Sequence, residues 1–181
     1  MSVTTDIGAK FLGKGWESTA ATFAVTNPAT GEEIAQIADC GEAEARRAVD
    51  LAAETFETWR HTTAFERSAL LERWADLMIE HQEELAAAMT NEMGKAIKES
   101  RGEVAYAASF VKWYAEEAKR IAGQTVQSQF SHKRLLALKQ PVGPVHAVTP
   151  GTSRWLWPRA RRARHWRQAA PSSSNRPSRV R

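Results

Sequence analysis

The sequence changes character between Pro150 and Gly151, and this break limits the part of the chain that can fold into a domain. Before the break, residues 140–150 place β-branched residues around Gly143 and Pro144, which is typical of a short buried strand and its exit loop. After it, the chain is rich in Trp, Arg, Pro and Ser and shows no periodicity. We therefore expect one core-forming region in the first 150 residues.

The charge of the chain divides at the same point. Residues 151–181 contain nine Arg and no Asp, Glu or Lys, so they carry +9. The first 150 residues contain 16 Lys and Arg against all 21 acidic residues, so they carry −5. The body thus has the mildly acidic balance of an ordinary soluble protein, and the basic character belongs to the tail alone.

Cysteine usage and hydropathy indicate a cytoplasmic protein. Cys40 is the single cysteine, so no intrachain disulfide can form and nothing favours secretion. The N-terminus lacks an apolar core of signal-peptide length. No segment approaches the roughly 20 apolar residues that a membrane-spanning helix needs, so we expect no membrane partner.

Residues 1–40 predict a small β arm. Short apolar runs at residues 23–25 and 34–37 are strand candidates. The turn between them holds Pro28, which fixes its own φ, and Gly31, which adopts a positive φ without steric cost. An antiparallel pair is therefore expected.

Residues 41–124 predict a helical layer, because apolar residues recur there with helical spacing. The first expected helix covers residues 42–59, and the second starts at the capping box Thr63-x-x-Glu66. The third covers residues 83–89 and is followed by a left-handed stop at Gly94. The fourth runs from about residue 95 to residue 122. The expected core stripe of the second helix is Leu70, Trp74, Leu77 and Met78.

Two strand units follow the helices. Residues 125–140 predict a strand pair, with its strands at 125–130 and 135–138. Residues 141–150 predict one further buried strand, at Val145–Thr149.

Three segments of this series resemble the NAD(P)-dependent aldehyde dehydrogenases. They are NPATGEEIA, EMGKAIKESRGEVAYAASFVKWYAEEAKRIAGQTV and KRLLALKQPVGPVHAVTP, and the similarity runs from about residue 8 to residue 150. NPATG alone is a weak signal, whereas the ordered series, with KQPVG before a strand that ends in TP, is specific. The long-helix segment is most similar to the succinate-semialdehyde dehydrogenases of that superfamily.

The resemblance implies an α/β fold of the aldehyde dehydrogenase type, of which this chain supplies a helix-rich N-terminal part. Residues 1–40 would form the β arm, 41–124 the helical layer, 125–140 the strand pair and 141–150 the first strand of a Rossmann-like cofactor domain. The full-length proteins would be homo-oligomers. Their reaction would oxidise an aldehyde, here succinate semialdehyde, to the carboxylic acid with NAD or NADP.

The residues after Pro150 depart from the family, in which WNFP normally follows. The codons TGG AAC TTC CCG encode WNFP, and removal of the first T gives GGA ACT TCC CGC, which encodes Gly151 to Arg154. With one T restored, permitted third bases allow the whole tail to be read as WNFPLAMATRKAGPALAAGCTVVVKPSE, which is similar to the family's continuation. We therefore interpret residues 151–181 as a frameshifted tail that ends at a premature stop.

A basic tail with interleaved Trp residues is also typical of a nucleic-acid-binding segment. The decoded reading outweighs this alternative, so we expect no specific nucleic-acid partner, while salt-sensitive binding to polyanions would fit the nine Arg. The few apolar residues of the tail offset little of the backbone entropy lost on ordering. We therefore expect residues 151–181 to be disordered.

The family's reaction requires a Cys thiolate that attacks the aldehyde, an Asn amide and a backbone N–H that hold the oxyanion, an oriented nicotinamide and a Glu that activates water. The oxyanion Asn belongs to the replaced WNFP, and the other groups belong to parts of the family's sequence beyond this chain. We therefore predict no catalytic residue and no metal site here. The backbone of Val148, Thr149 and Pro150 is the remaining cofactor-binding candidate, and we do not expect this fragment to bind NAD(P).

Other chemically suggestive residues have simpler interpretations. Cys40 precedes Gly41 at a strand-to-helix turn and is interpreted as a small structural residue. Four aromatic residues of the long helix could line a substrate entrance, but a helix packed between layers gives the same pattern, and we favour core packing; they are Tyr106, Phe110, Trp113 and Tyr114.

These observations predict that the chain descends from an aldehyde dehydrogenase. They also predict that the printed chain, the 181 residues of the sequence as given, is itself inactive. The alternative is a non-catalytic fragment that binds polyanions through its basic tail, or an intact dehydrogenase subunit through its arm.

Overall fold

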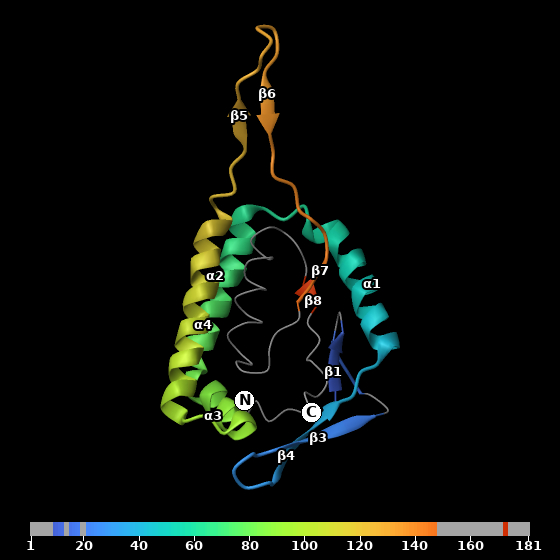
Figure 1. Ribbon diagram of the computed structural model, residues 1–181, viewed down its shortest axis with the longest axis vertical. Helices are drawn as coiled ribbons and strands as arrows, with labels where there is room; N and C mark the ends of the chain where they lie inside the picture. The colour runs from blue at the N-terminus through green and yellow to red at the C-terminus, as the bar shows by residue number, and fades with distance from the viewer. Residues whose placement is uncertain (1–8, 13–14, 19–20, 148–171, 174–181) are drawn as a thin grey trace.

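A computed structural model describes residues 9–12, 15–18, 21–147 and 172–173 (Figure 1). These residues form four helices and eight short strands, and the strands pair two by two. The helices are α1 (Glu42–Trp59), α2 (Ala64–Glu80), α3 (Gln82–Met93) and α4 (Ile97–Ala118). The strands are β1 (Ala9–Leu12), β2 (Gly15–Ser18), β3 (Thr22–Thr26), β4 (Glu33–Ala38), β5 (Gln124–Val126), β6 (Leu135–Ala137), β7 (Val145–His146) and β8 (Ser172–Ser173). The helix-rich α/β character predicted from the sequence is confirmed.

The main core lies between α2 and α4, which run side by side (Figure 1). Three of its four α4 residues are alanines, and such small side chains allow the two helices to approach closely. The buried residues are Leu71, Ala75 and Met78 of α2 and Ala107, Ala108, Val111 and Ala115 of α4. A second cluster of Ala86, Met89 and Val104 joins α3 to the same face of α4. The three helices therefore form one layer.

The core face of α2 differs from the predicted stripe. Met78 is buried as expected, but Leu71 is fully buried while Leu70 is 48% exposed. Adjacent residues lie about 100° apart on a helix, so the pattern of apolar residues alone does not separate two neighbouring stripes. Contact with α4 decides which of the two stripes of α2 is buried.

The start of α2 confirms the predicted capping box. The Glu66 backbone N–H donates to Thr63 Oγ1 at 3.2 Å, and the Thr63 backbone N–H donates to Glu66 Oε2 at 2.7 Å. The hydrogen bonds from the Thr63 backbone and side chain lower the pKa of the Glu66 carboxyl. The backbone N–H groups of Thr63 and Glu66 at the start of α2 thus both have hydrogen-bond acceptors.

Replacing Thr63 with Ala is expected to lower the free energy of unfolding by about 1 kcal/mol, since the Glu66 N–H loses its acceptor. Urea denaturation followed by circular dichroism measures the change. Thr63→Ser keeps the hydroxyl and is the matched control, with an expected loss well below that of Thr63→Ala. Equal losses in the two variants would show that the hydroxyl does not cap α2.

The β arm contacts the helical layer at the end of α3. β3 and β4 pair antiparallel, and Gly31 in their turn has φ 76°, as predicted. Gly94 ends α3 with φ 69°, and a Cβ built there would lie 3.0 Å from Cγ of Pro28. Gly94 is therefore required by its backbone conformation and by the close approach of the arm.

The β5–β6 hairpin stands away from the helices at one end of the molecule (Figure 1). Its strands are shorter than the predicted runs 125–130 and 135–138, because residues 127–134 form a long turn region. Leu136 and Leu138 are about 70% exposed, at 71% and 70%. The hairpin is thus held by its own pairing and buries little apolar surface within this chain.

Candidate functional site

The segment that the sequence associates with the cofactor follows β7. Gly143 leads into this strand with φ 101°, a backbone conformation that favours glycine, and Ala147 after the strand is buried. The cofactor-binding candidates Val148, Thr149 and Pro150 lie outside the described residues. The structure therefore positions the strand that leads to them, and their role stays a prediction.

The strand β7 has a parallel neighbour that the sequence did not predict. Val145 pairs with Ser172 and His146 with Ser173, in the parallel sense. Parallel strands need a crossover connection of a dozen or more residues, and the chain between β7 and β8 exceeds that length. The expectation of a tail without regular structure does not hold at Ser172–Ser173, and the rest of the tail lies outside the described residues.

Ion pairs in the helical layer connect neighbouring helices. Lys119 donates to Glu72 Oε1 at 3.0 Å, and the Ser68 hydroxyl donates to the same oxygen at 3.0 Å. The hydrogen bonds from Lys119 and Ser68 lower the pKa of Glu72, and the same contact raises the pKa of Lys119. Arg101 donates to both carboxylate oxygens of Glu83 at 2.8–3.0 Å, which lowers the pKa of Glu83. Each pair joins two helices, which is a structural role.

The Glu72 contact predicts a loss of stability in acid. Its folded-state pKa lies below its value in the unfolded chain, so its contribution is present above about pH 4.3 and is lost as the pH falls through the folded pKa. Glu72→Gln is expected to flatten this part of the stability–pH curve and to lower the stability at neutral pH by the same small amount, since the side chain is 43% exposed. Glu57→Gln, on the exposed surface of α1, is the control. An unchanged acid limb in Glu72→Gln would contradict the assignment.

The structure places Cys40 and the aromatic residues of the long helix, for which the sequence suggested both a chemical and a structural role. Cys40 is exposed in the link between β4 and α1. Tyr114 packs against the α2–α4 core, as expected, whereas Tyr106 and Trp113 are exposed, so core packing is wrong for these two. Tyr106 and Phe110 contact each other edge to face, with ring centroids 4.8 Å apart.

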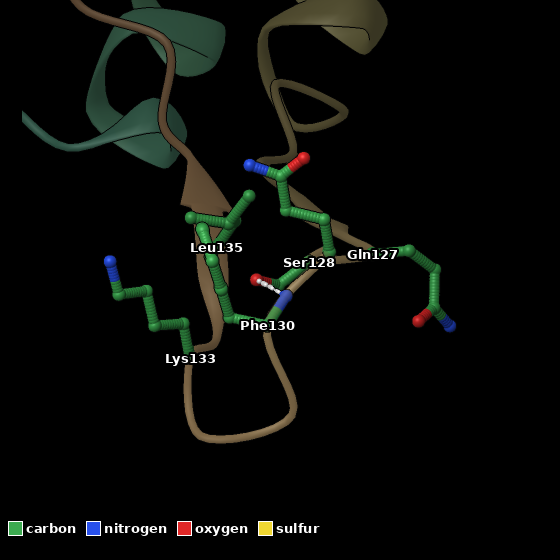
Figure 2. A pocket seen from close by; sticks show the side chains of 6 residues that line it. Gln127, Ser128, Phe130, Lys133 and Leu135 are labelled. Carbon is green, nitrogen blue, oxygen red and sulfur yellow. Dashed lines mark hydrogen bonds between the residues drawn. The ribbon is translucent and has the colours of Figure 1, made fainter.

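A shallow hollow lies at the end of the β5–β6 hairpin (Figure 2). The Phe130 backbone N–H donates to Ser128 Oγ at 3.0 Å, and Lys133 Nζ lies 4.5 Å from the centroid of the Phe130 ring. These contacts shape a turn, and every side chain around the hollow is exposed or half-buried. The arrangement offers no enclosed polar group for catalysis.

Two further properties concern the described part of the chain. It contains no group of three or more His, Cys, Asp or Glu side chains that could hold a metal ion. None of its helices combines the length and the hydropathy needed to cross a bilayer.

A helical layer that leads into a parallel strand pair places the chain in the α/β class. The comparison with protein families is more specific: residues 16–152 match the aldehyde dehydrogenase family, and the chain belongs to that family. The resemblance noted in the sequence is thereby confirmed. The family match ends two residues after Pro150, where the sequence changes character.

Several proteins are similar to most of this chain. A glutarate-semialdehyde dehydrogenase of Pseudomonas putida is 52% identical over 139 residues, which are 77% of this chain and 28% of the relative. The mitochondrial succinate-semialdehyde dehydrogenase of Rattus norvegicus is 44% identical over 153 residues, or 84% of this chain and 28% of the relative. The chain thus spans little more than a quarter of the length of these relatives.

Solved structures show the same fold. The crystal structure of a succinate-semialdehyde dehydrogenase from Burkholderia pseudomallei matches with a TM-score of 0.83 and 40% identity, over 92% of this chain and 35% of that one. An NADP-dependent enzyme of E. coli matches with a TM-score of 0.90 and 36% identity, over 93% of this chain and 35% of that one. The predicted fold class is confirmed.

Proposed function

We propose that the protein from which this sequence derives oxidises an aldehyde that carries an anionic group, with succinate semialdehyde as the first candidate, using NAD+ or NADP+. Membership of the aldehyde dehydrogenase family supports the reaction type. The observation that carries the substrate class is the set of relatives at 44–52% identity, named for succinate semialdehyde, glutarate semialdehyde and 3-sulfolactaldehyde. All three aldehydes carry a carboxylate or a sulfonate.

The printed chain itself is proposed to be inactive. The four catalytic groups that the family resemblance implies have no counterpart among its described residues. Cys40 is exposed in the link between β4 and α1, and the sequence interprets it as a small structural residue. The ion pairs of Arg101 with Glu83 and of Lys119 with Glu72 join neighbouring helices, which supports a structural role for these charged residues.

An assay of two proteins tests both statements. The purified 181-residue chain, given succinate semialdehyde with NAD+ or NADP+, is expected to form no NAD(P)H above a blank. The gene with one T restored before codon 151 is expected to yield a protein that turns over succinate semialdehyde faster than uncharged butyraldehyde. Turnover by the printed chain would overturn its inactivity. A preference of the restored protein for butyraldehyde would overturn the substrate class.

A second candidate function is docking onto an intact dehydrogenase subunit. The observation that favours it is the β5–β6 hairpin, which projects from the helical layer with Leu136 and Leu138 exposed (Figure 1). Isolated two-stranded hairpins are marginal in water, so this one is expected to gain stability by packing on a partner. Co-expression of the tagged printed chain with the restored full-length protein should give a complex that Leu136→Asp abolishes and Lys133→Asp retains. Polyanion binding, the other alternative, falls on residues outside the described part.

A further inference from the structure

The β5–β6 hairpin and the residues around it are positively charged, while the residues before it are predominantly acidic. Residues 119–147 contain five Lys and Arg, and no Asp or Glu follows Glu117 in the sequence. Residues 1–118 contain 11 Lys and Arg against all 21 acidic residues, so they carry −10. Figure 1 shows the hairpin projecting from one end of the helical layer. A positive projection thus extends from an acidic body.

The cations of this region fall into two groups. Lys119 and Arg120, which precede β5, are paired with carboxylates of the helices. Lys133, Arg134 and Lys139 are exposed, and they form no salt bridge with any residue that the structure describes. An anion that approaches these three side chains breaks no ion pair of the described chain, so its attraction to them is not offset by such a loss. The available positive charge therefore lies on the hairpin itself and directly after it.

An aromatic ring accompanies the cations at the turn of the hairpin. Phe130 is 46% exposed, and Lys133 Nζ lies 4.5 Å from the centroid of its ring. The centroid of the His132 ring lies 5.9 Å from that of Phe130. Figure 2 shows Phe130 and Lys133 beside the shallow hollow at this end of the hairpin. Exposed rings among cations are typical of surfaces that bind single-stranded nucleic acids, because bases stack on the rings and phosphates contact the cations.

We propose that the turn of the β5–β6 hairpin, residues 127–135, binds single-stranded polynucleotides without sequence preference. Lys133 and Arg134 contact phosphates, and one base stacks on Phe130. An acidic protein surface would use the cations but not the exposed ring, so the ring favours a polynucleotide. This surface is separate from the Arg-rich tail, and the proposal does not depend on the proposed dehydrogenase reaction.

The salt dependence of binding tests the role of the two adjacent cations. Fluorescence anisotropy measures the affinity of the printed chain for a labelled oligothymidylate over a series of salt concentrations. Each phosphate contact on a single strand adds about 0.7 to the slope of log K against log salt, so Lys133→Gln combined with Arg134→Gln is expected to lower the slope by about 1.4. The Arg-rich tail is present in both proteins, so the difference between them reports on the hairpin.

A second double variant controls for the change in net charge. Lys98→Gln combined with Arg46→Gln removes two exposed cations near the starts of α4 and α1, and the slope is expected to stay unchanged. An unchanged slope in the hairpin variant would place the binding elsewhere and overturn the proposal. An equal fall in the two double variants would also overturn it, because net charge alone would then determine binding.

Phe130→Ala tests the stacking contribution. This variant is expected to bind oligothymidylate at least about fivefold more weakly with the same salt slope, since it loses a ring and no charge. Leu138→Ala changes another exposed apolar side chain beside the hairpin and should retain the affinity. Polyglutamate, which is anionic but has no bases, should bind the printed chain more weakly than oligothymidylate. Equal binding of the two polymers, or an unchanged affinity in Phe130→Ala, would indicate an acidic protein partner and overturn the polynucleotide.

Discussion

Replacing Leu71 with Ala is expected to lower the free energy of unfolding by about 2–5 kcal/mol. Leu71 is fully buried between α2 and α4, and the smaller side chain leaves a cavity that rigid neighbours close only in part. Total stabilities of single domains are about 5–15 kcal/mol, so a loss at the upper end would unfold a large fraction of the molecules. Urea denaturation, followed by circular dichroism, measures the change in the printed chain.

The adjacent residue provides the matched control. Leu70→Ala makes the same chemical change one position away, on a side chain that is 48% exposed, and its expected cost is about 1 kcal/mol or less. The two variants also separate the observed core from the one that the periodicity predicts, since Leu70 belongs to the predicted stripe. If Leu70→Ala cost more than Leu71→Ala, the packing of α2 against α4 would be wrong.

Features with a local cause were predictable from the sequence. The capping box at Thr63 and Glu66 depends on residues three apart, and it formed as expected. The sequence predicts a positive φ for Gly31 and for Gly94, because no other residue adopts a positive φ so readily. Both glycines have a positive φ in the structure. The bounds of α1 at residues 42–59 also follow from local spacing and agree with the prediction.

Features that depend on a distant partner were not predictable. The choice of Leu71 over Leu70 is made by α4, and the exposure of Tyr106 and Trp113 reflects which side of α4 meets other elements. β8 carries no signal in the printed frame, because two serines do not indicate a strand. For the candidate site, the strand before Val148 was predicted, and the contacts of Val148, Thr149 and Pro150 remain predictions.

The salt bridge between Lys95 and Glu103 gives the second large effect. Glu103 on α4 has a side chain only 7% exposed, and Lys95, in the link before α4, is 25% exposed and donates to its carboxylate. Lys95→Met keeps most of the apolar stem but removes the positive charge from a buried carboxylate. Breaking buried pairs in this way costs about 3–5 kcal/mol, and the partial exposure of Lys95 places the expected loss at about 3 kcal/mol.

The converse variant is expected to cost less, because the two charges are not equally buried. Glu103→Gln leaves a lysine whose flexible stem can carry the ammonium group to water, so the expected loss is about 1 kcal/mol. A larger loss in Glu103→Gln than in Lys95→Met would show that the carboxylate is held mainly by partners other than Lys95.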